Sequence, residues 1–77
     1  MPFKIIDGYK VGFYSLDRGE PPHMHVLRGD NEAKIWLVPV EVEWNEGYNT
    51  RELNRIVGLI NEHQQELLEM WNDHFSQ

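Results

Sequence analysis

The stretch that decides the fold is NTRELNRIVGLINEHQQELLEMWNDHF, residues 49–75. At about 100° per residue its apolar positions recur with the period of an α-helix and gather on one face. That face comprises Leu53, Ile56, Val57, Ile60, Gln64, Leu67, Leu68, Trp71, His74 and Phe75. Asn49 stands three residues before Glu52, a pattern typical of a helix N-terminus, and no proline follows it. The sequence therefore predicts one long helix over 49–75 whose acidic residues face solvent.

Residues 1–45 have the composition of short strands. The predicted strands are residues 3–6, 9–15, 23–28, 32–38 and 40–44. Asp7-Gly8 between the first two is a strong hairpin signal, because both residues tolerate positive φ. In the last strand Val40, Val42 and Trp44 alternate with glutamates, which predicts one buried face and one exposed face.

These elements predict a single α+β domain, residues 1–77, with a strand-rich half and a C-terminal helix. The helix would cover one face of a mostly antiparallel sheet of four or five strands. Trp44 and Trp71 are predicted to meet in the core between sheet and helix. Trp36 alternates with Ile35 and Leu37 and is expected on the outer face, where an exposed tryptophan favours contact with a partner. A core of this size contributes only about 3 to 5 kcal/mol of stability.

Composition and charge restrict the class of protein. The net charge is −6, and all of the acidic excess lies after Val38, which disfavours broad binding to nucleic acid. There is no cysteine, so neither disulfides nor thiolate ligands are available. The longest apolar run, residues 35–38, is too short to cross a membrane, and the N-terminal residues do not resemble a secretion signal. We expect a soluble, cytoplasmic protein.

The segment GEPPHMHV, residues 19–26, holds the strongest candidates for a functional site. On a strand, His23 and His25 point to the same side, so the two imidazoles can act together. They could supply two ligands of a divalent metal ion, with His63 as the candidate third. They could also serve as general acid and base in cleaving RNA. A third interpretation is structural, because imidazoles can bond backbone groups near the two prolines.

Two segments together resemble a known family. EPPHMHVLRGDNEAKIWL, followed by the helical HQQELLEMW, is similar to the bacterial domain of unknown function 4160. The positions that match its motifs are Pro21, Pro22, His23, His25, Val26, His63, Glu66, Leu67, Leu68 and Trp71. The resemblance implies no established activity. It implies a gene neighbourhood shared with a second small domain, an arrangement interpreted as a toxin–antitoxin-like pair.

The leading functional expectation is a small protein-interaction module, with a small protein or a second copy as partner. The resemblance makes it a candidate for one half of such a two-gene pair. The candidate contact residues are Trp36, Leu59 and Met70. The alternative is a small ribonuclease or metal-dependent hydrolase that uses His23 and His25. No cofactor is required by the sequence, although a divalent metal remains open. We also expect the loop containing Pro21 and Pro22 to lie near His63, which would join the three histidines.

Overall fold

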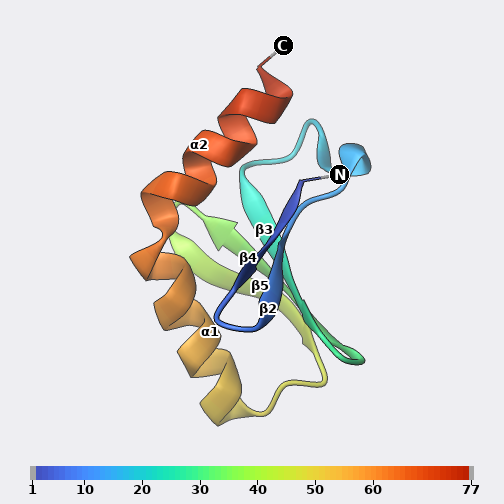
Figure 1. The fold of residues 1–77 in the computed structure, drawn as a ribbon, viewed down its shortest axis with the longest axis vertical. Helices are drawn as coiled ribbons and strands as arrows, with labels where there is room; N and C mark the ends of the chain where they lie inside the picture. The colour runs from blue at the N-terminus through green and yellow to red at the C-terminus, as the bar shows by residue number, and fades with distance from the viewer. Residues whose placement is uncertain (1, 77) are drawn as a thin grey trace.

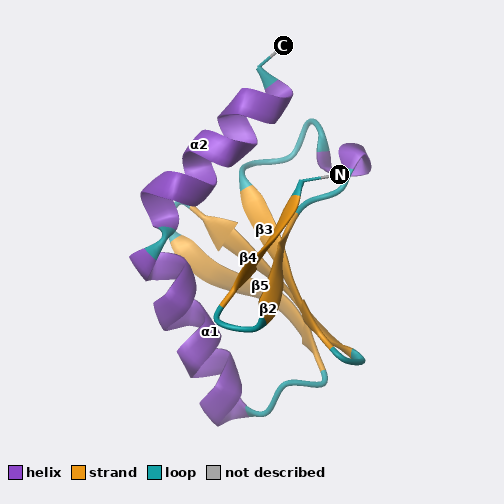
Figure 2. Cartoon of the chain, in the orientation of Figure 1, coloured by secondary structure: helices purple, strands orange, loops and turns teal. Residues whose placement is uncertain are grey.

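The computed structural model describes residues 2–76 as five strands followed by two helices (Figure 1). The strands are β1 (Phe3–Ile6), β2 (Tyr9–Gly12), β3 (His23–Arg28), β4 (Asn31–Leu37) and β5 (Val40–Glu46). The helices are α1 (Thr50–Glu62) and α2 (Gln64–Phe75), and a 3-10 turn, Ser15–Asp17, lies between β2 and β3. Both helices lie along the same side of the sheet (Figure 2). The predicted α+β class is confirmed.

The sheet is an antiparallel meander in which strand order follows chain order, β1-β2-β3-β4-β5. The predicted first hairpin is confirmed: Asp7 and Gly8 form its turn with φ of 53° and 85°. β4 and β5 are joined through Val38 and Pro39, whose peptide bond is cis. Each strand thus pairs only with its neighbours in the chain, which requires nothing longer than local connections.

The core lies between one sheet face and the helices. Its fully buried side chains include Val11, Phe13, Met24, Val26, Ile35, Leu37, Ile56, Ile60 and Leu67. The strand residues in this set alternate along each strand, as the two-residue period requires. The alternate positions of β3, His23 and His25, therefore belong to the other face of the sheet.

The C-terminal segment is two helices, so the prediction of one long helix is wrong. Its start is as expected, since the Asn49 side chain accepts a hydrogen bond from the Glu52 amide at 2.8 Å. The helical conformation is interrupted at His63, with φ −104° and ψ 13°. Immediately after the break the Gln64 side chain donates a 2.6 Å hydrogen bond to the Leu37 carbonyl at the end of β4. This bond attaches the start of α2 to the sheet, and the change of direction lets both helices follow a twisted surface.

Trp44 does not reach the core, contrary to the sequence prediction. The pairing of β4 with β5 shifts between Lys34 and Ile35, so that Ile35 pairs with Val42 but Lys34 pairs with Trp44. The extra residue on β5 reverses the side to which the following side chains point. Val40 and Val42 pack on the core as predicted, whereas the Trp44 ring lies 5.8 Å from that of His25 on the other face.

Burial of Tyr48 makes the fold sensitive to alkaline pH. The Tyr48 hydroxyl donates to the Val26 carbonyl at 3.0 Å, and burial followed by the nearby Tyr9 and Glu52 raises its pKa to about 12. Because the folded-state pKa lies above the ordinary value of 10.0, the stabilisation is complete below pH 10 and is lost as pH rises toward 12. We expect urea denaturation to show a loss of about 2 kcal/mol over this range. In Tyr48→Phe the loss should be clearly smaller; an equal loss would contradict the assignment to Tyr48.

Candidate functional site

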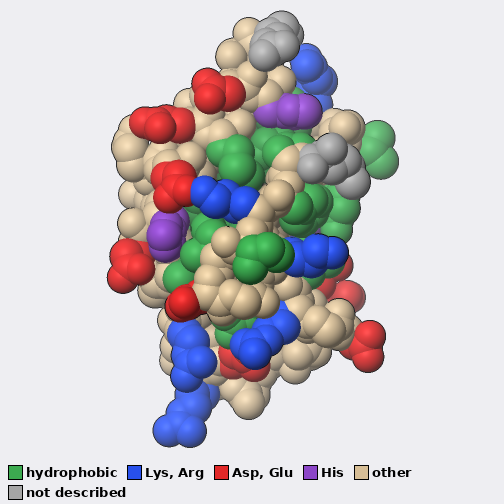
Figure 3. All heavy atoms as spheres, viewed as in Figure 1, with side chains coloured by type: hydrophobic (Ala, Val, Ile, Leu, Met, Phe, Trp, Pro, Cys, Tyr) green, Lys and Arg blue, Asp and Glu red, His purple; other side chains and the backbone are tan. Residues whose placement is uncertain are grey.

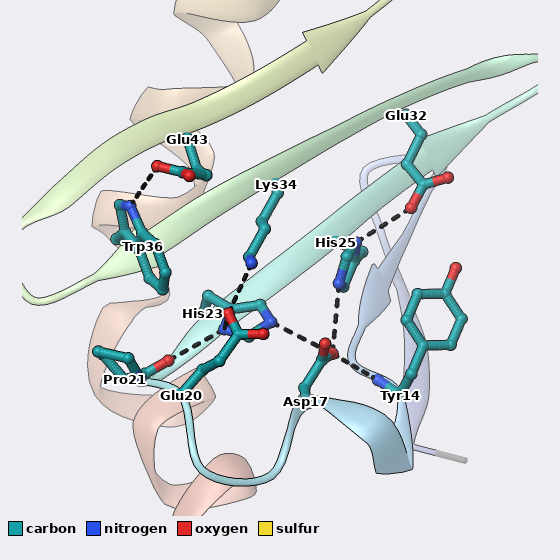
Figure 4. A network of polar contacts seen from close by, with 10 residues as sticks. All are labelled: Tyr14, Asp17, Glu20, Pro21, His23, His25, Glu32, Lys34, Trp36 and Glu43. Atoms are coloured by element: carbon teal, nitrogen blue, oxygen red, sulfur yellow. Dashed lines mark hydrogen bonds and ion pairs between the residues drawn. The ribbon is translucent and has the colours of Figure 1, made fainter.

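The candidate site is built by the segment that returns the chain from β2 to β3. After β2 the chain makes the Ser15–Asp17 turn and passes through Pro21 and Pro22 before β3 begins at His23. The turn is fixed by its own contacts, because the Tyr14 amide donates to the Asp17 carboxylate at 2.8 Å. This return path carries Asp17 onto the sheet face that bears the two β3 histidines (Figure 4).

Asp17 lies between the imidazoles of His23 and His25. Its Oδ2 atom is 3.2 Å from Nε2 of His23 and 3.2 Å from Nε2 of His25. The side chains of His23 and His25 are 0% and 8% exposed, and that of Asp17 is 12% exposed. Although these distances suit ion pairs, neither buried Nε2 makes a hydrogen bond of acceptable geometry with any described residue. Three polar side chains therefore converge in a place that solvent barely reaches (Figure 4).

The opposite ring nitrogens are each held by an acceptor. Nδ1 of His23 lies 2.9 Å from the Pro21 carbonyl oxygen, and Nδ1 of His25 lies 3.0 Å from the Glu32 carboxylate. Both contacts fix the orientation of an imidazole ring relative to Asp17. The predicted bond between a histidine and a backbone group near the prolines is therefore present at Pro21.

Aromatic rings enclose the two imidazoles. The His23 ring lies 5.4 Å from that of Trp36 and 5.0 Å from that of Trp71, while the His25 ring lies 4.7 Å from that of Tyr14. Trp71 belongs to α2, so the helix reaches this end of the sheet. Apolar rings lower the local dielectric, which strengthens electrostatic interactions among the polar atoms that they enclose.

The Asp17 carboxyl group is ionised at neutral pH. Burial by itself raises its pKa. The hydrogen bond from the Tyr14 amide and the neighbouring His23 and His25 lower the pKa by a larger amount, so the net pKa lies below the ordinary 3.8. The site thus offers a carboxylate and two imidazoles. Such a set can hold a cation, or it can exchange protons between its members.

His63 lies elsewhere, at the junction of α1 and α2. Its Nδ1 is 3.1 Å from Glu66, whose carboxylate also pairs with Lys4. The Lys4 ammonium first, and His63 second, hold the pKa of Glu66 below its usual value. Among residues 2–76, the group whose ligand atoms lie within 4.8 Å of one another is Asp17, His23 and His25, without His63. The helix residue that contacts His23 is Trp71 instead.

The other residues singled out from the sequence differ in burial and in location. Pro22 accepts a 3.0 Å backbone hydrogen bond from Leu37 and so joins the loop to β4. Trp36 is partly exposed on the outer face, as expected, and its indole N–H donates to Glu43 at 3.0 Å. Leu59 is 8% exposed and belongs to the core, while Met70 is partly buried against it. Burial removes Leu59 from the accessible contact candidates.

Asp17 is the site residue that the sequence reasoning missed. The sequence analysis expects the third ligand at His63 in the distant helix, because an imidazole there could reach the strand. The available signal was local: Asp17 precedes His23 by six residues, and the intervening glycine and two prolines favour a chain reversal. A carboxylate before such a reversal can return to the face of the following strand.

The family to which the chain belongs can now be stated. Residues 8–72 match the model of a domain of unknown function, DUF4160, and the chain is a member of that family. The matched region includes Asp17, both site histidines and the contacting Trp71. Comparison with curated proteins and with solved structures gave no significant match. Within residues 2–76, neither helix has the length and apolar composition needed to span a membrane.

Proposed function

We propose that this domain is a small protein-interaction module whose contact surface is the sheet face opposite the helices. We call this surface the open face and define it by Leu27, Lys34, Trp36, Glu41, Glu43 and Trp44. The observation that carries the proposal is the pair of partly exposed tryptophans, Trp36 and Trp44, on that face. Tryptophan is enriched among the residues that dominate binding energies in protein interfaces.

The side chain of Trp36 on the open face is already positioned for contact. The indole of Trp36 donates to Glu43 at 3.0 Å, and the Lys34 ammonium lies 4.8 Å from its ring centroid. Lys34 is in turn paired with Glu20 at 2.6 Å. A side chain held in this way loses little conformational entropy on binding, which supports a contact role.

The charge distribution supports a partner of defined chemistry. The chain carries a net charge of −6, and its Asp and Glu side chains gather over the α2 region in the view of Figure 3. Glu41 and Glu43 are exposed on the open face beside the two tryptophans, so a small protein with basic and apolar side chains would suit it. In a toxin–antitoxin-like pair, the product of the neighbouring gene would be that partner.

The test is to replace Trp36 and measure retention of the partner. We expect the tagged chain, purified gently from its own cells, to carry a small protein at equal stoichiometry in native mass spectrometry. Trp36→Ala should reduce that retention at least about tenfold, since truncating a tryptophan that dominates a contact typically costs more than 1 kcal/mol. The matched control is Met70→Ala, which removes a partly exposed side chain from α2.

Two outcomes would reject the proposal. Release of the partner by Met70→Ala but not by Trp36→Ala would place the contact on α2. A chain that purifies alone as a monomer and cleaves RNA, with cleavage lost in His25→Gln, would replace the interaction module with the hydrolase alternative. The 3.2 Å contacts of Asp17 with the two histidines support that alternative, but their burial requires the 14–22 segment to move before a substrate could enter.

A further inference from the structure

The Nε2 atoms of the two site histidines are buried and have no hydrogen-bond partner among residues 2–76. Nδ1 of His23 faces the Pro21 carbonyl oxygen, and Nδ1 of His25 faces the Glu32 carboxylate; both partners only accept hydrogen bonds. In a neutral imidazole the single proton therefore resides on Nδ1, and Nε2 keeps a bare lone pair. Each Nε2 atom lies 3.2 Å from the carboxylate oxygen of Asp17.

Three electron-pair donors facing one another in a buried place repel unless a positive charge lies among them. The two Nε2 atoms are buried and without a hydrogen-bond partner among residues 2–76, so no described donor relieves the repulsion. The charge can come from protons on the imidazoles or from one metal ion. A single divalent ion neutralises all three donors at once, whereas two added protons leave two buried imidazolium rings beside one another.

We propose that Asp17, His23 and His25 bind a divalent transition-metal ion of the zinc class. Two imidazoles and one carboxylate form a common protein ligand set for such ions. The second contact of each imidazole, to the Pro21 carbonyl or to Glu32, matches the outer hydrogen bond that orients metal-bound histidines. The absence of cysteine disfavours Cu(I), and the two imidazoles disfavour Mg²⁺ and Ca²⁺.

The spacing of the donors fits this class of ion. Ligand atoms about 2.0 to 2.2 Å from a zinc ion lie roughly 3.0 to 3.5 Å from one another. The Asp17 carboxylate meets this requirement with both histidines at 3.2 Å. Binding therefore requires little rearrangement of the ligand atoms, which lowers its free-energy cost.

The metal would also join two separate parts of the fold. Asp17 comes from the 3-10 turn after β2, while His23 and His25 belong to β3. Holding them on one ion fixes the connecting segment to the sheet, as structural metals do in other small domains. The two histidines lie on the same side of the sheet as the open face, next to Trp36 and Trp44. The ligand atoms themselves are buried, so the metal can be tested without the proposed partner.

Titration of the chelator-treated, full-length chain with Zn²⁺ tests the proposal. We expect isothermal titration calorimetry to give one ion per chain and the Tm to rise by about 10 °C at a hundredfold excess over Kd. Co²⁺, a spectroscopic substitute, should give visible absorption that Zn²⁺ abolishes. Asp17→Asn keeps an oxygen for the Tyr14 amide but loses the anionic ligand, and should weaken binding at least about 100-fold. His63→Ala, a histidine outside the group, should bind like the wild type.

The proposal is overturned by wild-type protein that binds less than one ion per chain or shows no Zn²⁺-dependent rise in Tm, since the histidines then hold protons instead. Equal Zn²⁺ affinity in Asp17→Asn and wild type would likewise overturn it. If Asp17→Asn fails to fold by circular dichroism, His25→Gln takes its place. The Co²⁺ spectrum of the wild type provides a readout that needs no variant. Because none of these measurements involves a partner, failure here is distinct from failure of the interaction proposal.

Discussion

Trp71→Ala should leave most of the chain unfolded at 25 °C. Trp71 is 5% exposed, and its ring lies 5.0 Å from Phe13, 5.0 Å from His23 and 4.4 Å from Phe75. Truncation of a buried tryptophan costs about 3 to 5 kcal/mol, because the removed atoms leave a cavity that the surroundings fill only partly. A single core in a chain of this length supplies about the same amount. Far-UV circular dichroism with urea titration measures the result.

The matched control is Trp44→Ala. Trp44 is also a tryptophan in regular secondary structure, since it lies on β5. It is, however, partly exposed on the face away from the helices. Its removal creates no closed cavity, and we expect a loss of about 1 kcal/mol or less. Equal destabilisation by the two substitutions would contradict the assignment of Trp71 to the core and Trp44 to the open face.

His23→Ala is expected to lower the free energy of unfolding by about 2 to 4 kcal/mol, measured with a chelator present so that no metal contributes. The side chain is completely buried, fills space between the rings of Trp36 and Trp71, and anchors Pro21 through its Nδ1 atom. Its loss combines a cavity with an orphaned carbonyl group. His23 thus has a packing role whether or not it also binds a metal.

His63→Ala provides the comparison for this prediction. The His63 side chain is 30% exposed and contacts the exposed Glu66, so its removal should cost less than about 1 kcal/mol. If both substitutions are equally mild, the histidine of β3 is not a core residue and the structural part of the interpretation is wrong. Chemical denaturation of both variants at the same pH decides the matter.

Much of the architecture could be predicted from the sequence, because several strong local signals agree. The Asp7-Gly8 turn, the Asn49 cap and the helical periodicity around Ile60 each depend on few neighbours. Such signals act within a turn or two of the chain, so a single sequence contains all the information that they need. The mostly antiparallel sheet could be predicted from the short turns expected between neighbouring strands, whereas the strand order came from the structure.

The errors arose where one residue changes the geometry of a whole segment. The irregular pairing beside Lys34 turned Trp44 to the outer face, and alternation alone cannot reveal an inserted residue. The break at His63 has neither a proline nor a glycine at its position; it accompanies a side-chain bond from Gln64 to Leu37, a residue 27 positions away. Contacts of that range are not encoded in local periodicity.

The candidate site could be predicted only in part for the same physical reason. The strand period placed His23 and His25 on one side, but the convergence of Asp17 on them depends on the path of residues 14–22. Family motifs directed attention to His63, whose side chain instead contacts Glu66. Whether Asp17 joins the two histidines depends on the three-dimensional path of residues 14–22. The sequence alone does not give that path.

The meander order of the sheet has a consequence for how the protein is made. Every strand pairs with its neighbour in the chain, so the sheet needs only short loop closures and can form quickly once residues 3–46 have left the ribosome. Its inner face, with Val26 and Ile35 fully buried in the final structure, has no cover until the helices are synthesised. A nascent chain that stalls before Thr50 would therefore expose the apolar inner face of the sheet. We expect chaperones to bind this aggregation-prone surface.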